Sequence, residues 1–183
     1  MYAVISYPRS GSRALAQKYS ETTGLPIGYL HHAKSVPSYC LTYQELTEND
    51  WILHAHWHTV HLLKQEYKKH IEENYKIVHI DRDEEHIFLS SIITMATGNI
   101  DFCKEDIPSN IDINLVDKYF KRMKPTKENM LDWRIDIRYN FDKLYNKTSL
   151  ANFENNKKQV KNYKQLYEKL QMNEKYIMCQ VGQ

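Results

Sequence analysis

The sequence predicts an α/β fold of three layers, in which a parallel sheet is flanked by helices on both faces. Three observations predict it. Short, mostly apolar runs rich in strand-forming residues alternate with segments of helical periodicity over the first hundred residues. Strands that alternate with helices favour a parallel sheet covered on both sides. After Gly98 the pattern changes to helical segments dense in Lys, Asn and Tyr.

Each element follows from its local pattern. Residues 2–6 form an apolar run that ends before Pro8, and the helix after it is expected to stop at Gly24, a residue suited to a left-handed helix end. The expected strands are 2–6, 51–56 and 76–80. The expected helices are the one before Gly24 and those at 60–74, 83–96, 112–123, 126–147 and 153–171. Residues 25–49 are assigned only as loop with short elements, and no strand is expected after Gly98.

The length of 183 residues suits a single domain, 1–183. Within it, residues 2–97 are expected to form the α/β core and residues 98–183 a mainly helical part. The composition is that of an ordinary folded protein, with 42% hydrophobic and 26% charged residues. No segment resembles a linker or a repeat.

Composition also excludes several classes of function. Lys and Arg total 25 against 23 acidic residues, too even a balance to predict a nucleic-acid partner. No apolar run approaches the roughly 20 residues of a membrane span, and the N-terminus lacks the pattern of a signal peptide. The three cysteines are widely spaced, as expected of reduced thiols inside a cell. We therefore expect a soluble, intracellular, cytoplasmic protein with no membrane partner.

The glycines narrow the choice among nucleotide-binding folds. They lie at positions 11, 24, 28, 98 and 182. No two have the spacing of a Walker A motif, and no three have the spacing of G-x-G-x-x-G. A Walker-type ATPase and an ordinary Rossmann dehydrogenase are both disfavoured.

The loop after the first strand, Tyr7-Pro8-Arg9-Ser10-Gly11-Ser12-Arg13, is predicted to bind an anion. A parallel sheet places its ligand site outside the carboxyl ends of its strands. Gly11 lets the backbone approach a ligand, and the N–H groups of residues 10–13 converge at the N-terminus of a helix, where partial positive charge favours an anion. Ser10 and Ser12 add hydroxyl donors, and Arg9 and Arg13 add positive charge. The alternative is a serine cap with two solvated arginines.

Tyr-Pro-Arg-Ser-Gly-Ser resembles the 5′-phosphosulfate loop of the PAPS-dependent sulfotransferases. That family has a second element, a strand ending in Arg with a Ser eight residues later. Here Arg82 follows the third predicted strand, and Ser90 lies eight residues on, in the following helix. An arginine at the carboxyl end of a parallel strand faces the same edge as the loop. The resemblance covers residues 2–97 and implies a P-loop NTPase-like sulfotransferase fold.

The resemblance implies a transferase that moves a sulfuryl group from PAPS to a hydroxyl or amine acceptor and releases adenosine 3′,5′-bisphosphate. Arg9 stands at the position of the family's catalytic basic residue, and the loop would hold the 5′-phosphate. Arg82 and Ser90 would grip the 3′-phosphate. The expected nucleotide-binding residues are thus Arg9, Ser10, Gly11, Ser12, Arg13, Arg82 and Ser90. No metal is expected, and the acceptor, a small molecule or carbohydrate, is not specified, nor is the oligomeric state.

Four histidines, His54, His56, His58 and His61, lie close to the end of the second predicted strand. In the sulfotransferases a Lys-Thr-His motif ends this strand, which implies that His56 is the general base. A histidine with a pKa near neutrality suits that role. A metal site is a second interpretation, although Trp57 occupies the place where an H-x-H-x-D-H motif has Asp. A structural or solvated set of histidines is the third.

Two features of the family are absent. Ala14 replaces the Trp that stacks on adenine, so that Trp133 or a tyrosine would have to serve, and no Arg-Lys-Gly stretch lies near the C-terminus. Arg134 and Arg138, one turn apart on a predicted helix, are candidates to replace it, although pairing with neighbouring aspartates is favoured. A catalytically weak nucleotide- or anion-binding protein of the same fold is therefore the alternative function, followed by a His-cluster metalloprotein.

Overall fold

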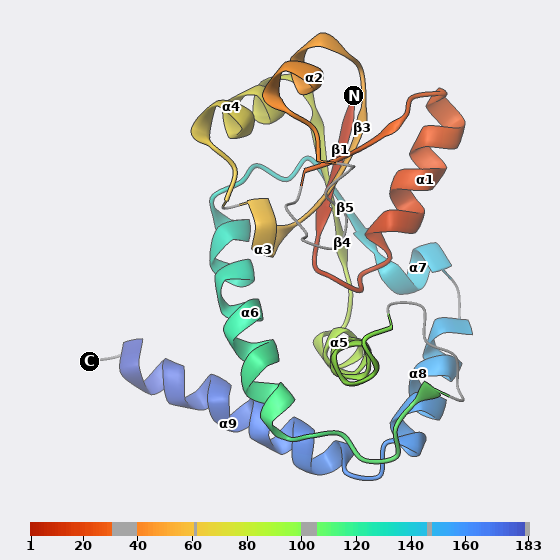
Figure 1. The fold of residues 1–183 in the computed structure, drawn as a ribbon, viewed down its shortest axis with the longest axis vertical. Coiled ribbons are helices and arrows are strands. Elements are labelled where there is room, and N and C mark those ends of the chain that lie inside the picture. The colour runs from red at the N-terminus through yellow and green to blue at the C-terminus, as the bar shows by residue number, and fades with distance from the viewer. Residues whose placement is uncertain (31–39, 61, 100–105, 146–147, 182–183) are drawn as a thin grey trace. The chain divides into compact units, whose positions relative to one another are not determined.

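The computed structural model in Figure 1 describes residues 1–30, 40–60, 62–99, 106–145 and 148–181. The chain divides into two compact units. The first comprises Met1–Arg82 and Pro125–Leu144, and the second comprises Asp83–Lys124 and Tyr145–Gln183. The first unit contains the sheet, and the second is helical in its described part.

The sheet has five strands, all parallel, in the order β2-β3-β1-β4-β5. The strands are β1 (Tyr2–Ser6), β2 (Ile27–Tyr29), β3 (Ile52–His56), β4 (Lys76–Asp81) and β5 (Ile137–Asn140). The three strands predicted from apolar runs are confirmed as β1, β3 and β4. Together with the flanking helices they confirm the α/β class and the parallel sheet.

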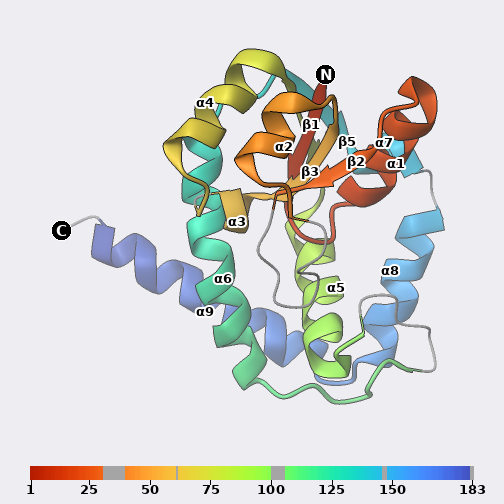
Figure 2. The same cartoon turned by 45° about the horizontal axis from the view of Figure 1, so that its top comes forward.

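Helices cover both faces of the sheet. The helices of the first unit are α1 (Ser12–Thr23), α2 (Tyr43–Glu48), α3 (Trp57–Val60), α4 (Gln65–Asn74) and most of α7 (Phe141–Tyr145). Figures 1 and 2 both show α1 on one side of the strands and α3 and α4 on the other. The α1 side receives Tyr2, whose ring stacks on Tyr19 with 4.4 Å between centroids.

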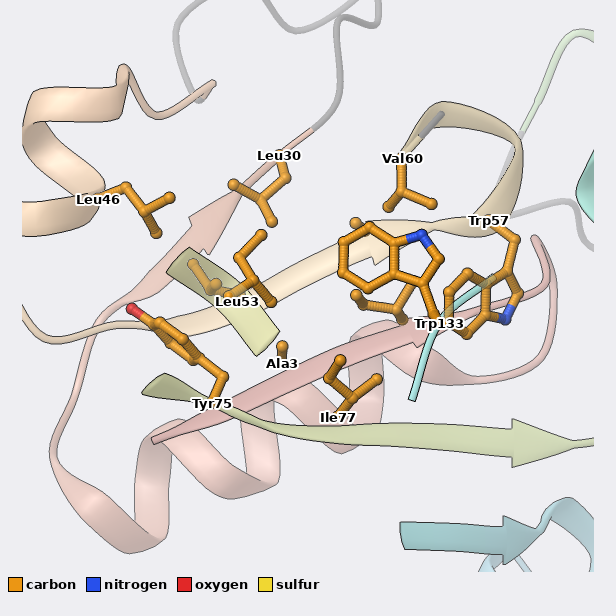
Figure 3. Packing of buried hydrophobic residues seen from close by; sticks show 12 residues of the cluster. Ala3, Leu30, Leu46, Leu53, Trp57, Val60, Tyr75, Ile77 and Trp133 are labelled. Carbon is orange, nitrogen blue, oxygen red and sulfur yellow. The ribbon is translucent and has the colours of Figure 1, made fainter. Parts of the chain in front are cut away.

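The opposite face of the sheet carries the main core of this unit. Ala3, Ile5, Leu53, Ala55 and Ile77 alternate along three strands and point to the same side, where residues of α3 and α4 cover them. Figure 3 shows the Trp57 and Trp133 rings next to each other in this cluster, with 6.1 Å between their centroids. Trp57 is fully buried and Trp133 is 8% exposed.

The second unit is built around α5 (Glu84–Thr97), with α8 (Thr148–Gln159), α9 (Tyr163–Val181) and the first part of α6 (Asn114–Leu131). Asp83 caps α5 by accepting the N–H groups of Glu85 and His86, and Gly98 ends the helix with a φ of 69°. The ring of Phe88 on α5 contacts Tyr119 on α6 and Tyr163 on α9. Aromatic packing around a buried, mostly apolar α5 therefore holds this unit together.

The sequence prediction that no strand follows Gly98 is wrong, because residues 137–140 form β5 at the edge of the sheet. The expected helix at 126–147 is accordingly replaced by the end of α6, a loop, β5 and α7. Two hydrogen bonds of Asp136 explain why a strand forms here. Its N–H donates to the Ile77 carbonyl at 2.9 Å, and its carboxylate accepts the Ile77 N–H at 2.8 Å. These bonds to β4 begin the pairing of β5.

The other differences are at helix boundaries. The predicted helix 60–74 is divided between α3 and α4, and α6 continues through the predicted break at 124–125. The predicted helix 153–171 is interrupted between α8 and α9, where the Asn162 side-chain amide bonds both backbone groups of Ile111. The described residues include no helix that is both long and apolar enough to cross a membrane.

Candidate functional site

The strand order creates a topological switch point between β1 and β4. From β1 the chain goes to β2, on one side of the sheet, whereas from β4 it goes to β5, on the other side. Two neighbouring strands whose connections leave in opposite directions form a crevice at their carboxyl ends, and open α/β sheets bind ligands there. The residues at these two ends are the loop 7–13 and Arg82, both of which the sequence nominates.

The loop 7–13 adopts a conformation that only particular residues accept at low cost. Gly11, at the N-cap of α1, has a φ of 79°, and Arg9 has a φ of 66°. Among the described residues other than glycine, Arg9 alone has a positive φ. A side chain in this left-handed region costs roughly 1 kcal/mol. Backbone strain of this kind tends to occur at functional loops.

The Ser10 side chain ties the loop to the two central strands. Its Oγ donates to Ser6 Oγ at 2.9 Å, and Ser6 Oγ in turn donates to the Ile80 carbonyl at 3.0 Å and accepts the Ile80 N–H at 3.2 Å. Ser6 and Ser10 are fully buried. The Ser10 hydroxyl, expected from sequence as a ligand donor, thus bonds inside the protein, and the Ser10 N–H donates to the Tyr7 carbonyl at 3.3 Å.

Ser12 connects the loop to β3. Its Oγ lies 3.0 Å from His54 Nε2, and both residues are buried. Arg13, the next residue of α1, is exposed. No side chain caps the start of α1, because its N-cap residue is Gly11. The first turn of α1 therefore presents main-chain donors without a capping carboxylate or hydroxyl from the N-cap position.

His56 lies at the end of β3, beside the start of the loop. In the parallel register it is paired with Ser6, the last residue of β1. His54 and His56 are two positions apart on one strand and share a face, with 5.1 Å between their ring centroids. His54 is 3% exposed, whereas His56 is only partly buried. Of the two, His56 is the one with access to solvent, as a general base requires.

The wider histidine cluster is not a continuous extended segment. α3 begins at Trp57, so that the alternation that would place His58 with His54 and His56 ends at His56. The side chain of His58 is not described, and His61 and Cys103 lie outside the described residues, as does the side chain of Cys179. The side chains that are described contain no group of three or more His, Cys, Asp or Glu able to hold a metal ion.

Arg82 contacts the loop directly. Its Nη1 donates to the carbonyl of Arg9, the residue with the left-handed conformation. Its guanidinium also stacks on the Phe141 ring, with 4.1 Å between Cζ and the ring centroid. The prediction that an arginine after β4 shares an edge with the loop 7–13 is thus matched by a contact between them. Ser90 lies on α5 in the second unit, where it is partly buried.

A buried histidine lies beneath this edge, on the core face of the sheet. The Trp57 indole Nε1 donates to His79 Nδ1 at 3.0 Å, and His79 Nε2 lies 3.2 Å from Asp81 Oδ1. Because an indole nitrogen can only donate, Nδ1 must accept, and the ring proton of neutral His79 lies on Nε2, toward Asp81. Arg138 on β5 contacts the same Asp81 oxygen at 3.3 Å.

Burial dominates the titration of His79. It lowers the pKa of the imidazole from its ordinary value of 6.5, since a charged ring would lie out of water. The Ile5 carbonyl and the Asp81 carboxylate oppose this shift, and Arg138 adds to it. Protonation at Nδ1 would also place two donors, the ring N–H and the indole N–H, against each other. His79 is therefore neutral at the pH of a cell.

All three residues named as candidates for the missing family features make contacts within the protein. Arg134 and Arg138 do not share a helix, since Arg134 precedes β5 and Arg138 lies within it. Arg134 pairs with Asp136 at 2.8 Å, one of the neighbouring aspartates that the sequence favoured, whereas Arg138 pairs with Asp81 on β4, which the sequence did not indicate. The Trp133 ring packs against Trp57 in the core cluster and is 8% exposed.

Comparison of the chain with protein-family models, with curated proteins and with solved structures found no match.

Sequence reasoning missed three residues of this site. Ser6 carried a signal, because a serine that closes an otherwise apolar strand needs a buried partner. His79, in the middle of an apolar run, carried the same signal. Phe141 carried no such signal in the sequence. It lies next to Arg82 because it directly follows β5, a strand that the sequence pattern did not indicate.

Gly11→Ala tests whether the left-handed N-cap gives the loop 7–13 the conformation that binds an anion, and Gly24→Ala at the other end of α1 is the matched control. Each glycine has a φ above 70°, so each alanine should lower the free energy of unfolding by about 1 kcal/mol in denaturant titrations. Added atoms at Gly24 meet nothing within 4 Å. Calorimetric binding of pyrophosphate should weaken in Gly11→Ala alone. Equal weakening in both variants would contradict a specific role for the loop.

His79 should make the protein less stable in mild acid. The pKa of His79 in the folded protein is below the unfolded value of 6.5. As the pH falls, the unfolded chain therefore binds a proton at His79 before the folded chain does. The stability that neutral His79 contributes is complete above pH 6.5 and is lost as the pH falls below it. His79→Asn, which retains an acceptor for Trp57, should flatten unfolding free energy against pH between 6.5 and 5. His70→Asn is the control, and parallel curves for His79→Asn and the wild type would refute the argument.

Proposed function

We propose that the protein is a PAPS-dependent sulfotransferase, which transfers a sulfuryl group from PAPS to a hydroxyl or amine acceptor. The observation that carries the proposal is the contact of Arg82 with the loop 7–13 at the switch point between β1 and β4. The two motifs of the resemblance, more than 70 residues apart in sequence, are thereby neighbours at the edge where a parallel sheet binds its ligand.

In this proposal the loop holds the 5′-phosphate of the nucleotide. The N–H groups at the start of α1 face an anion with the positive end of the helix dipole. Arg9 stabilises the negative charge that develops on the leaving phosphate oxygen. The hydroxyls of Ser10 and Ser12 serve mainly to fix the loop, since they bond to Ser6 and His54. These bonds support the proposal because stabilisation of a transition state requires donors placed in advance.

Arg82 binds the 3′-phosphate and thereby distinguishes PAPS from ATP and AMP. Arg82 is suited to this because a guanidinium matches a phosphate with donors in a fixed planar fork. The resemblance also assigns Ser90, eight residues after Arg82 in the sequence, to this phosphate.

His56 is the general base. The acceptor O–H loses its proton to the imidazole while its oxygen attacks sulfur in line. The S–O bond to the bridging oxygen breaks, and adenosine 3′,5′-bisphosphate departs with the electron pair. The place of His56 at the end of β3, beside the loop and partly exposed, supports this role. Positioning and charge stabilisation supply the remainder of the rate acceleration.

Titration calorimetry with adenosine 3′,5′-bisphosphate and AMP tests the binding part of the proposal. The wild type should bind the bisphosphate at least tenfold more tightly, and Arg82→Ala should remove most of this difference by deleting the 3′-phosphate contact. Arg134→Ala is the control, because it removes a positive charge whose partner is Asp136. Equal affinity of the wild type for both nucleotides would refute the proposal.

His56→Ala tests the transfer step. With PAPS and a panel of phenols, alcohols and carbohydrates, turnover should fall at least a hundredfold, as loss of a general base requires, while bisphosphate affinity stays within twofold. His70→Ala, a partly buried histidine of α4, should turn over like the wild type. If the wild type binds the bisphosphate but transfers to no acceptor, the alternative of a catalytically weak nucleotide-binding protein of the same fold is favoured.

A further inference from the structure

Phe141 is placed next to Arg82 by the register of the sheet. β4 and β5 are parallel, and Asp81 is paired with Asn140 at their carboxyl ends. Arg82 and Phe141 are the next residues of the two strands, so they leave the sheet side by side. Phe141 is also the first residue of α7, and its side chain is 8% exposed. The ring is therefore fixed by its surroundings and provides a rigid surface.

The Arg82 guanidinium is held at two points. One face lies over the Phe141 ring at 4.1 Å, a separation at which a cation and an aromatic ring attract. One edge donates from Nη1 to the carbonyl of Arg9. A stacked face sets the plane of the guanidinium, and a bonded edge sets its rotation within that plane. Because the donors of a guanidinium have fixed directions, these two contacts determine where its remaining N–H groups point.

An arginine held in this way loses less freedom when it binds a ligand. A solvated arginine side chain must give up several rotamers to form a bidentate contact, which weakens binding. At Arg82 the folded protein has already restricted them. The contact with Arg9 also couples Arg82 to the loop, so the place of the arginine and the place of the loop are set together.

We infer that Phe141 is a positioning residue that holds Arg82 for the second phosphate of the nucleotide, and so determines the preference for a bisphosphate over a monophosphate. This inference rests on the proposed function. It assigns to the end of β5, outside the two motifs of the resemblance, a part in nucleotide selection. The chemistry of the selected ligand is a nucleoside carrying phosphates at both the 5′ and 3′ positions.

The test compares Phe141→Leu with Phe141→Tyr, using adenosine 3′,5′-bisphosphate and AMP in titration calorimetry. Leucine keeps an apolar side chain but removes the aromatic face, so affinity for the bisphosphate should fall about tenfold while affinity for AMP stays within twofold. Tyrosine keeps the face and should bind both nucleotides as the wild type does. In an Arg82→Ala background, Phe141→Leu should have no further effect on bisphosphate affinity, because the residue that it positions is gone.

The outcomes separate the inference from the function on which it rests. Equal affinity of the wild type for the two nucleotides overturns both. A wild-type preference for the bisphosphate that survives in Phe141→Leu overturns the inference alone, as does an equal loss of both nucleotides, which would indicate a general structural role. Should Phe141→Leu fail to fold by circular dichroism, Phe141→Met replaces it with a second apolar side chain that lacks a ring, and the same comparison decides.

Discussion

Parallel pairing of β1 with both β3 and β4 is the constraint on which the rest of the structure depends. It places the ends of three strands at one edge and fixes which residues meet there. Backbone pairing of β1 with β4 runs from Tyr2 to Val4, and beyond it the Ser6 hydroxyl bonds both backbone groups of Ile80. A side chain thus takes over where the loop departs, which keeps the buried groups of Ile80 satisfied. The topological switch point between β1 and β4 lies at this end of the strands.

Buried polar groups surround this edge on both faces of the sheet. The His54 ring and the Ser12 hydroxyl are hydrogen-bonded on the α1 side, while His79 accepts the Trp57 indole N–H on the other side. Burying a polar group is costly unless a partner is present, so these positions limit how the strand ends can be arranged. For His79 the limit extends to its charge, because both burial and the indole donor favour the neutral ring. We interpret this framework as the source of the loop's rigidity, and rigidity is what the proposed chemistry requires.

Much of the site could be predicted from sequence, because its main parts are local. The loop 7–13 could be predicted from its residue types, because Gly11 stands just before a helix. Arg82 could be predicted from its position directly after an apolar strand. Contacts within the site could not be predicted in the same way. The Ser10 and Ser12 hydroxyls suit a ligand equally well by residue type, and only the positions of Ser6 and His54 show that they bond inside the protein. The position of Phe141 beside Arg82 depends on the pairing of β4 with β5, which the local sequence pattern does not indicate.

The sequence by itself determined the α/β class, the three central strands and both glycine stops, at Gly24 and Gly98, since apolar runs and left-handed helix ends are local properties. Only the tertiary structure decided that residues 137–140 form a strand, because its partner, β4, lies more than 50 residues away in the chain. It also decided the break between α8 and α9, which Asn162 and Ile111 fix by pairing across a similar distance. Short segments have no strong preference of their own, and what they become is set by the groups that satisfy their backbone.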